Sequence, residues 1–442
     1  MQLNKIIALA AMTLVGTYTA SAQLSPYCQA DLVFDNNLDF FDVSAFLMAY
    51  DNNDLAADFD NSGSLDFFDV SAFLQLFNTG CPDLTDTDGD RLPDFVETDN
   101  GIYLGIMATG SDPLNADTDG DAIEDGDEVL GTPEGLEFPD SNPVRKDIYV
   151  ECDWFQGVFQ GRSENYRPTP AVESRVVACF VNASTQNPYN LPDGILIHLD
   201  YGQDADNTGG NQLPGSPDVI QFDSEFNQYK ADHFDPRRQG YYHYAIFANR
   251  YNSSTNGSSG VAEIYGDDFM VTMVNYNSTN NMANTIAHEL GHNLGLRHGG
   301  DENRNRKPNY NSVMNYRHQF PGVDTNADTW GNGVLDYSHG FNNSINELAI
   351  DESTGVLGSP VDFNHNNIID KGAYALNINC SGLVTAECLT LPPSGCVDST
   401  CDVLTDHDDW DNIYFHGPFI ATDRRQAPEI VPCENWPGKQ FD

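Results

Sequence analysis

The chain has 442 residues, enough for about two or three domains, and an ordinary apolar share of 40%. Its charge is unusual, because 67 Asp and Glu against 20 Lys and Arg give a formal net charge of -47. Such a chain repels phosphate backbones and anionic lipid, which excludes nucleic acid and membrane surfaces as expected partners. The excess carboxylates form either a solvated surface or organised cation sites, and their spacing distinguishes the two.

The first 22 residues have the layout of a secretory signal peptide. Lys5 gives a positive start, residues 6–15 form an apolar run, and Ala20-Ser21-Ala22 is a small-residue cleavage signal. The run is too short to span a bilayer, and no other stretch of the sequence is long and apolar enough to do so. We therefore expect a secreted protein without a membrane span, with attachment to a cell surface left open.

Nine cysteines in an exported chain indicate disulfide bonds. Cys28 and Cys81 bracket the first module, and Cys152 and Cys179 stand alone in the middle of the chain. The other five crowd the C-terminal region: Cys380, Cys388, Cys396, Cys401 and Cys433. The odd total leaves at least one thiol without a partner in its own chain, and the pairing stays open.

The stretch FFDVSAFL occurs at residues 40–47 and is repeated without change at residues 67–74. The segment before the second copy has oxygen side chains at loop positions 1, 3, 5, 9 and 12, which are Asp58, Asp60, Ser62, Asp66 and Asp69. Gly63 at position 6 suits a sharp turn, so this loop can wrap one calcium ion. The loop before the first copy has Val33 at position 3, and we expect weaker binding there.

Apolar residues at helical spacing after each loop predict one short helix per repeat. Paired loop-helix units with Asp rather than Glu at position 12 resemble a dockerin-like or EF-hand pair, here covering residues 28–81. The resemblance implies a cohesin-like or cell-surface partner. The alternative is a solvated acidic linker, but an identical repeat of this kind is not low-complexity sequence.

Two further acidic loops follow at residues 86–97 and 117–128, and both begin with DTDGD. Their calcium-ligand positions are occupied by Asp86, Asp88, Asp90, Asp94 and Glu97, and by Asp117, Asp119, Asp121, Asp125 and Glu128. They resemble thrombospondin type 3 calcium repeats, here within residues 84–142. Carboxylates this dense repel one another without a divalent ion, so we expect structural calcium. A disordered acidic spacer is the alternative.

From residue 145 the composition changes to that of an α+β catalytic domain, which we place at residues 145–340. Residues 146–155 and 194–202 are apolar runs of strand length, and residues 170–183 between them have helical spacing. Two further strands are predicted around Val261 and Val271. A polar helix start follows, with Asn281 or Asn284 as the cap.

That helix carries HELGHNLGLRH. His288 and His292 lie one turn apart on the same face, and a chain that ends its helix at Gly295 can bring His298 to the same ion. Three histidines with a fourth position left to water are typical of catalytic zinc, since structural zinc sites usually contain thiolates. Glu289 lies beside the ligands and can act as the general base for a zinc-activated water.

This pattern, HExxHxxGxxH, is the signature of the metzincin metalloproteases. A second feature supports the resemblance: SVMNY places Met314 a short distance after the third histidine, as in the methionine turn beneath the zinc. The resemblance gives Tyr316 a role as hydrogen-bond donor to the developing oxyanion. The residue after His298 is Gly299, which leaves the metzincin subfamily open; pappalysin-like enzymes are one candidate relative.

The metzincin resemblance also implies a fold. We expect a twisted mixed sheet, an active-site helix and an irregular lower subdomain beginning at Gly295. Residues 260–264 would be the edge strand that holds an extended peptide by main-chain hydrogen bonds.

The C-terminal residues 341–442 form a cysteine-containing extension that is either separate or part of the catalytic domain. Asp362, Asn364, Asn366 and Asp370 have calcium-like spacing, but position 12 is Ala373, so we expect at most a partial site. HDDWDN at residues 407–412 is expected to be a solvated loop.

Three functions fit this sequence. The leading one is a secreted, calcium-stabilised zinc endopeptidase that hydrolyses protein or peptide substrates. The second is a calcium-dependent adhesion or scaffold protein whose metzincin-like domain no longer cuts, which the intact Glu289 disfavours. The third is a zinc hydrolase acting on a non-peptide bond, which the edge-strand prediction disfavours.

Overall fold

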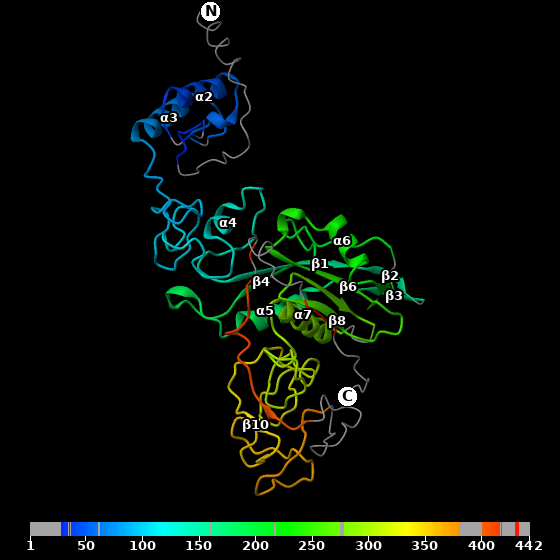
Figure 1. Cartoon of the computed structure of the whole chain (residues 1–442). Helices are drawn as coiled ribbons and strands as arrows, with labels where there is room; N and C mark the ends of the chain where they lie inside the picture. The colour runs from blue at the N-terminus through cyan, green and yellow to red at the C-terminus, as the bar shows by residue number, and fades with distance from the viewer. Residues whose placement is uncertain are drawn as a thin grey trace, which may run out of the picture. The chain divides into compact units, whose positions relative to one another are not determined.

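A computed structural model describes most of the chain (Figure 1). The described residues are 28–33, 35, 37–60, 62–159, 161–215, 218–274, 278–380, 400–415, 417 and 429–432. The predicted signal peptide lies outside them. Within these residues no helix combines the length and apolar character needed to cross a membrane.

The chain divides into two compact units. The first contains residues 1–116 and 125–137, and the second contains residues 117–124 and 138–442. The second acidic loop is therefore shared, since its first part, residues 117–124, belongs to the unit that also contains the predicted catalytic domain. The sequence analysis instead keeps the whole of this loop within residues 84–142, apart from the domain at residues 145–340.

In the first unit the two repeats form two helices, as predicted. Helix α2 spans Phe40–Asp51 and helix α3 spans Phe67–Thr79, with the 3₁₀ turn η1 (Leu55–Ala57) between them. Each helix begins in a capping box, in which Asp39 and Asp42 or Asp66 and Asp69 satisfy the first backbone N–H groups. The repeated acidic residues therefore have a second task as helix caps.

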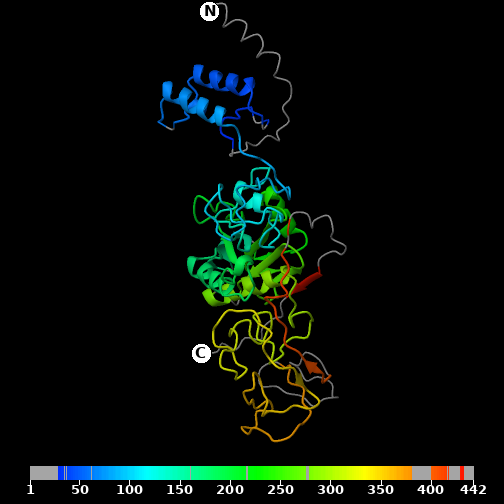
Figure 2. The ribbon, with the colours of Figure 1, turned by 90° about the vertical axis from the view of Figure 1, so that its left-hand side faces the viewer.

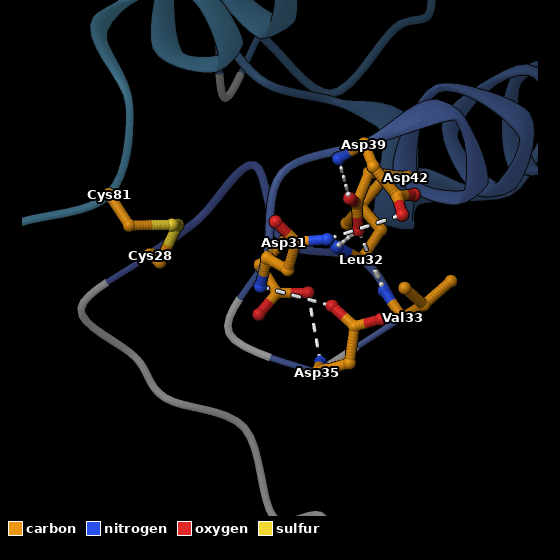
Figure 3. The surroundings of a disulfide bond; sticks show 9 residues. Cys28, Asp31, Leu32, Val33, Asp35, Asp39, Asp42 and Cys81 are labelled. Atoms are coloured by element: carbon orange, nitrogen blue, oxygen red, sulfur yellow. Dashed lines mark hydrogen bonds between the residues drawn. A yellow bond between two sulfur atoms is a disulfide. The ribbon is translucent and has the colours of Figure 1, made fainter. Parts of the chain in front are cut away.

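The core of these repeats is built from equivalent residues of the two copies. Phe46 and Phe73 are both 1% exposed and stack with ring centroids 4.2 Å apart. Ala30 and Ala57, which also occupy equivalent positions of the two copies, complete the buried centre. A disulfide joins Cys28 to Cys81 and closes the module at its two ends (Figure 3).

The remainder of the first unit contains the loop that starts at Asp86 and a short helix, α4 (Asp125–Leu130), which packs against it. Leu92 and Val96 are fully buried there, with Val129 and Leu130 packed against them. Acidic residues of the same segment, among them Asp90 and Glu97, are buried next to these residues in the sequence.

The second unit is built on a mixed six-stranded sheet in the order β12-β8-β9-β6-β1-β4 (Figures 1 and 2). Its strands, in chain order, are β1 (Asp147–Trp154), β4 (Leu196–Asp200), β6 (Tyr242–Ala248), β8 (Gly260–Ile264), β9 (Asp268–Thr272) and β12 (Glu429–Pro432). β4, β1, β6 and β9 run parallel, whereas β8 and β12 are antiparallel to their neighbours. β1, β4, β8 and β9 lie where the sequence predicts strands.

One strand prediction is wrong. The sequence places residues 260–264 at the edge of the sheet, but β12 pairs with the outer side of β8. β12 comes from a segment near the C-terminal end of the chain, far from β8 in sequence, and no local pattern in β8 indicates such a partner.

The remaining strands of the described residues form three small two-stranded sheets. They pair β2 (Gln156–Phe159) with β3 (Arg162–Asn165), β5 (Val219–Ile220) with β7 (Arg250–Tyr251), and β10 (Ile345–Asn346) with β11 (Val403–Leu404). The 3₁₀ turns η2 (Pro188–Asn190) and η3 (Pro236–Arg238) lie in connections.

Helices cover both faces of the large sheet (Figure 1). On β6, Tyr244 packs against Phe226 of α6 (Glu225–His233), while the neighbouring His243 contacts Asn293 of α7 (Thr279–Asn293). Successive strand residues point to opposite faces, so α6 and α7 lie on opposite sides. Helix α5 (Pro170–Val181), predicted at residues 170–183, packs against α7.

The predicted cap of the active-site helix is also corrected. The N-cap is Ser278, whose Oγ accepts the N–H of Asn281 at 3.2 Å, and neither Asn281 nor Asn284 caps the helix. Asn284 is buried, donates to the carbonyl of Gln319 and accepts from Arg175. Serine is as good a cap as asparagine, so local sequence does not decide between the three.

Beyond α7 the chain is irregular, as the resemblance implies. The prediction of a solvated loop at residues 407–412 is wrong, because Asp409 and Trp410 are 0% and 1% exposed. Trp410 packs edge-on against Phe180 of α5 and against Tyr337. Part of the C-terminal extension thus belongs to the core of the catalytic unit.

Candidate metal centre and active site

The structure brings the three predicted zinc ligands together. The ring centroids of His288 and His292 are 4.8 Å apart, those of His292 and His298 are also 4.8 Å apart, and His288 and His298 are separated by 5.3 Å. The Nε2 atoms of His292 and His298 lie 3.2 Å from each other. Gly295, with φ of 95°, ends the helix and lets the chain turn back toward His298.

Backbone carbonyls orient two of these rings. Nδ1 of His288 donates to the carbonyl of Val313 at 2.9 Å, and Nδ1 of His292 donates to the carbonyl of Leu296 at 2.7 Å. A neutral imidazole protonated at Nδ1 presents the lone pair of Nε2, which is the form that binds a metal. Burial, together with the charge of His292, lowers the pKa of both His288 and His298 well below the usual range.

These residues fit a zinc ion. The ligand nitrogens of the three histidines lie within 4.8 Å of one another. Nε2 of His288 is buried and has no hydrogen-bond partner among the described residues, which is costly for a polar atom unless a ligand satisfies it. Three nitrogen donors without a thiolate match a catalytic rather than a structural zinc site.

Glu289 lies on α7 beside this cluster, is fully buried, and faces Gly260, the first residue of β8. A side-chain carbon added at Gly260 would lie 2.3 Å from Oε1 of Glu289 and 2.6 Å from the carbonyl of Met270. Only glycine therefore allows β8 to approach the glutamate this closely.

Met314 packs against α7. It is fully buried, and its Sδ would lie 2.4 Å from a side-chain carbon added at Gly291. Gly291 precedes the ligand His292, so Met314 packs directly against the backbone that positions it. The hydroxyl of Tyr337 donates to the carbonyl of Ala287 on the same helix.

Tyr316 packs against the zinc ligands. Its ring centroid is 4.3 Å from that of His298 and 5.7 Å from that of His288, and the side chain is 5% exposed. Its backbone N–H donates to Oδ1 of Asn305 at 2.9 Å, which fixes the turn that carries it.

Sequence reasoning did not single out Asn293, the last residue of α7. Its side-chain amide donates to the carbonyls of Glu263 at 2.8 Å and Asp268 at 3.1 Å, and so fastens the helix to β8 and the start of β9. Its place directly after His292 in the sequence is the signal that could have indicated this role.

In the two N-terminal acidic loops, backbone N–H groups donate to the carboxylates. In the second loop the carboxylates of Asp58, Asp60 and Asp69 converge, and Asp58 accepts the N–H groups of Ser62 and Gly63 at 3.0 and 2.7 Å. Asp66 caps α3. In the first loop Asp42 accepts from Leu32, Val33 and Asp39 at 2.8, 3.1 and 2.9 Å (Figure 3).

In the first unit the structure groups carboxylates from both of the later acidic loops. Asp86, Asp88 and Asp90 converge as one set, and Asp90, Glu97 and Asp125 as another. Asp94 accepts the N–H and Oγ1 of Thr87 at 2.8 and 2.7 Å, and Glu128 lies on α4 and is 7% exposed. The sequence assigned Asp125 to a loop of its own, and its grouping with Asp90 and Glu97 depends on tertiary structure.

In the second unit Asp117, Asp119 and Asp121 converge. Oδ2 of Asp121 accepts the backbone N–H of Asp147, the first residue of β1, at 2.6 Å. The first part of the acidic loop at residues 117–128 is thus fastened to the start of β1.

Buried carboxylate oxygens without partners indicate that these groups suit a cation. Oδ2 of Asp90, Oε2 of Glu97 and Oδ2 of Asp119 have no hydrogen-bond partner among the described residues. Burial, with nearby acidic groups, raises the pKa of Asp90 to about 7 and that of Glu97 to about 8. Burial and Asp121 raise the pKa of Asp119 well above its usual value. A divalent ion with oxygen ligands would offset this cost.

At the partial site predicted at residues 362–373, Glu352 makes the hydrogen bonds that the residue at position 12 makes in the first loop. Glu352 is fully buried and accepts the N–H groups of Phe363, Asn364 and Asp370 at 3.0, 3.3 and 2.8 Å. These are loop positions 2, 3 and 9, the same three donors that Asp42 accepts in the first loop. Sequence reasoning missed Glu352 because it precedes the loop.

A comparison with protein families supports the class of this site. Residues 197–299 match the model of the family described as Metallo-peptidase family M12B Reprolysin-like. The match contains Glu289, all three histidines and Gly295, and it supports a zinc metallopeptidase domain. No curated protein matches the sequence.

Removing calcium is expected to destabilise the protein, because the buried carboxylates would then repel one another or bind protons. With calcium at about 100 times its dissociation constant, its removal should lower the unfolding temperature by roughly 5–10 °C. Calorimetry in zinc-containing buffer, with calcium or an equal concentration of magnesium, measures this.

Asp119→Asn should reduce that calcium-dependent shift, whereas Asp206→Asn, in an exposed loop, should leave it unchanged. Equal unfolding temperatures with calcium and with magnesium would show that these sites have no specific role for calcium.

Proposed function

We propose that the chain is a secreted zinc-dependent endopeptidase whose fold is stabilised by calcium. The observation that carries the proposal is the buried cluster of His288, His292 and His298 with Glu289 beside it. The family match over residues 197–299 supports the class, and the apolar run with a cleavage signal at the N-terminus supports export.

The roles of the chain's own residues follow from their chemistry. His288, His292 and His298 would hold the ion through Nε2. Zinc bound there would supply Lewis acidity, which acidifies a water molecule and polarises the scissile carbonyl. A carboxylate oxygen of Glu289 accepts the proton of the attacking water and passes it to the leaving amine.

Tyr316 is proposed as the second group that acts on the substrate. Its ring packs beside His298, so its hydroxyl can donate a hydrogen bond to the oxygen on which negative charge develops. Met314 packs against Gly291 of the helix and is proposed to support the ligands without contacting the substrate.

The N-terminal module is proposed to bind a partner, cohesin-like or on a cell surface. Phe40 and Phe67, at equivalent positions of the two repeats, are 75% and 73% exposed, and Phe41 and Phe68 beside them are also exposed. Large exposed apolar groups of this kind are typical of interaction surfaces. The same observation favours the second candidate, an adhesion or scaffold protein, but a scaffold has no need of a buried Glu289.

Replacing Glu289 by Gln is expected to abolish peptide cleavage while the protein keeps its zinc. The amide is isosteric but cannot accept the proton, so kcat should fall by about 10²–10⁴-fold. Casein cleavage and zinc content, measured on the same preparation, test this. Full activity of the variant would refute the proposed role of Glu289.

Tyr316→Phe keeps the ring that packs on His298 and removes only the hydroxyl. Loss of an oxyanion donor should lower kcat by about 10²-fold or more, with KM and zinc content nearly unchanged. Steady-state kinetics on one peptide substrate separate kcat from KM. An unchanged kcat would assign Tyr316 a packing role alone.

A further inference from the structure

The outer side of β8 is covered by the chain's own C-terminal segment. β12 (Glu429–Pro432) pairs antiparallel with β8 (Gly260–Ile264), and the register sets Pro432 opposite Val261 and Glu429 opposite Ile264. The pairing joins four residues of β12 to β8 through the backbone, and Ile430 is 45% exposed.

β8 runs directly alongside the catalytic group. Its first residue, Gly260, lies against Glu289, and the neighbouring Ser259 Oγ accepts a hydrogen bond from Gln319 at 3.1 Å. At its other end the carbonyl of Glu263 accepts from Asn293, and the N–H of Tyr265 donates to the carbonyl of His292. An extended chain paired with the outer side of β8 would therefore be led toward Glu289.

A strand has only two sides for main-chain pairing. β9 occupies one side of β8, with Gly260 opposite Val271, and β12 occupies the other. Any extended peptide presents the same N–H and C=O groups as β12, so a peptide and β12 compete for the same positions. The short length of β12 makes this pairing the part of the sheet that is easiest to displace.

We propose that β12 is an internal competitor of the peptide substrate: the C-terminal strand occupies the peptide-binding side of β8 and must leave before a substrate can pair there. This inference rests on the proposed endopeptidase function, because it assumes that the substrate is an extended peptide. It makes the C-terminal segment a regulatory element of the active site, removable by displacement or by proteolysis.

The test uses two full-length variants that replace the same two residues, one without and one with the backbone N–H groups. Ile430→Pro with Val431→Pro removes two N–H groups from β12, whereas Ile430→Thr with Val431→Thr changes the same side chains and keeps both N–H groups. Both are made in the zinc-loaded Glu289→Gln background, so that binding is measured without cleavage.

The probe is fluorescein-labelled β-casein, an unfolded chain, and its affinity is read by fluorescence anisotropy. The apparent dissociation constant equals the intrinsic one divided by the fraction of protein with β8 accessible. The proline variant, in which that fraction is larger, should therefore bind on the order of tenfold more tightly than the threonine variant. Hydrogen exchange should show the amides of residues 260–264 protected in the threonine variant and exchanging faster in the proline variant.

Equal affinities of the two variants, including the case in which neither binds, would overturn the inference. The proposed function is tested separately, by casein cleavage in the same pair of variants with Glu289 restored. If cleavage is absent in both while the affinities differ, the competition by β12 holds and the endopeptidase function fails. If both variants cleave casein and their affinities are equal, the endopeptidase function holds and the competition by β12 fails.

Discussion

The catalytic unit depends on the orientation of two imidazole rings on one helix. His288 and His292 lie one turn apart on α7, and the carbonyls of Val313 and Leu296 hold their Nδ1 atoms, so both Nε2 atoms face the same point. Without these two hydrogen bonds the rings could rotate, and the close approach of His298 would not complete a metal site. The glycine turn at Gly295 and the packing of Met314 both maintain this arrangement.

The sheet supports the active-site helix, and part of one acidic loop is fastened to the same sheet. Asn293 fastens α7 to β8 and to the start of β9, and Asp121 fastens the first half of an acidic loop to the start of β1. The acidic residues of the chain are therefore not only surface charges. Many of its carboxylates lie in clusters that suit a cation, and one such cluster adjoins the sheet on which the active-site helix rests.

Local sequence patterns predicted much of this structure, and long-range contacts account for the rest. The histidine spacing indicated a shared helix face, and the repeat indicated two loop-helix units built around Phe46 and Phe73. By contrast, the pairing of β12 with β8 and the packing of Trp410 on Phe180 join segments far apart in the chain. Glu352 lies outside the calcium-like spacing, because it precedes the loop whose N–H groups it accepts. Composition and spacing contain no signal for such pairings, because the partner's position depends on the completed fold.

Anomalous scattering at the zinc absorption edge, from crystals grown with added zinc, tests the central claim most directly. The account predicts one strong peak at about 2.0–2.1 Å from the Nε2 atoms of His288, His292 and His298, with Nδ1 of the first two still bound to backbone carbonyls. A pocket without a peak, or a metal bound through Nδ1 or by fewer than three of these rings, would contradict it.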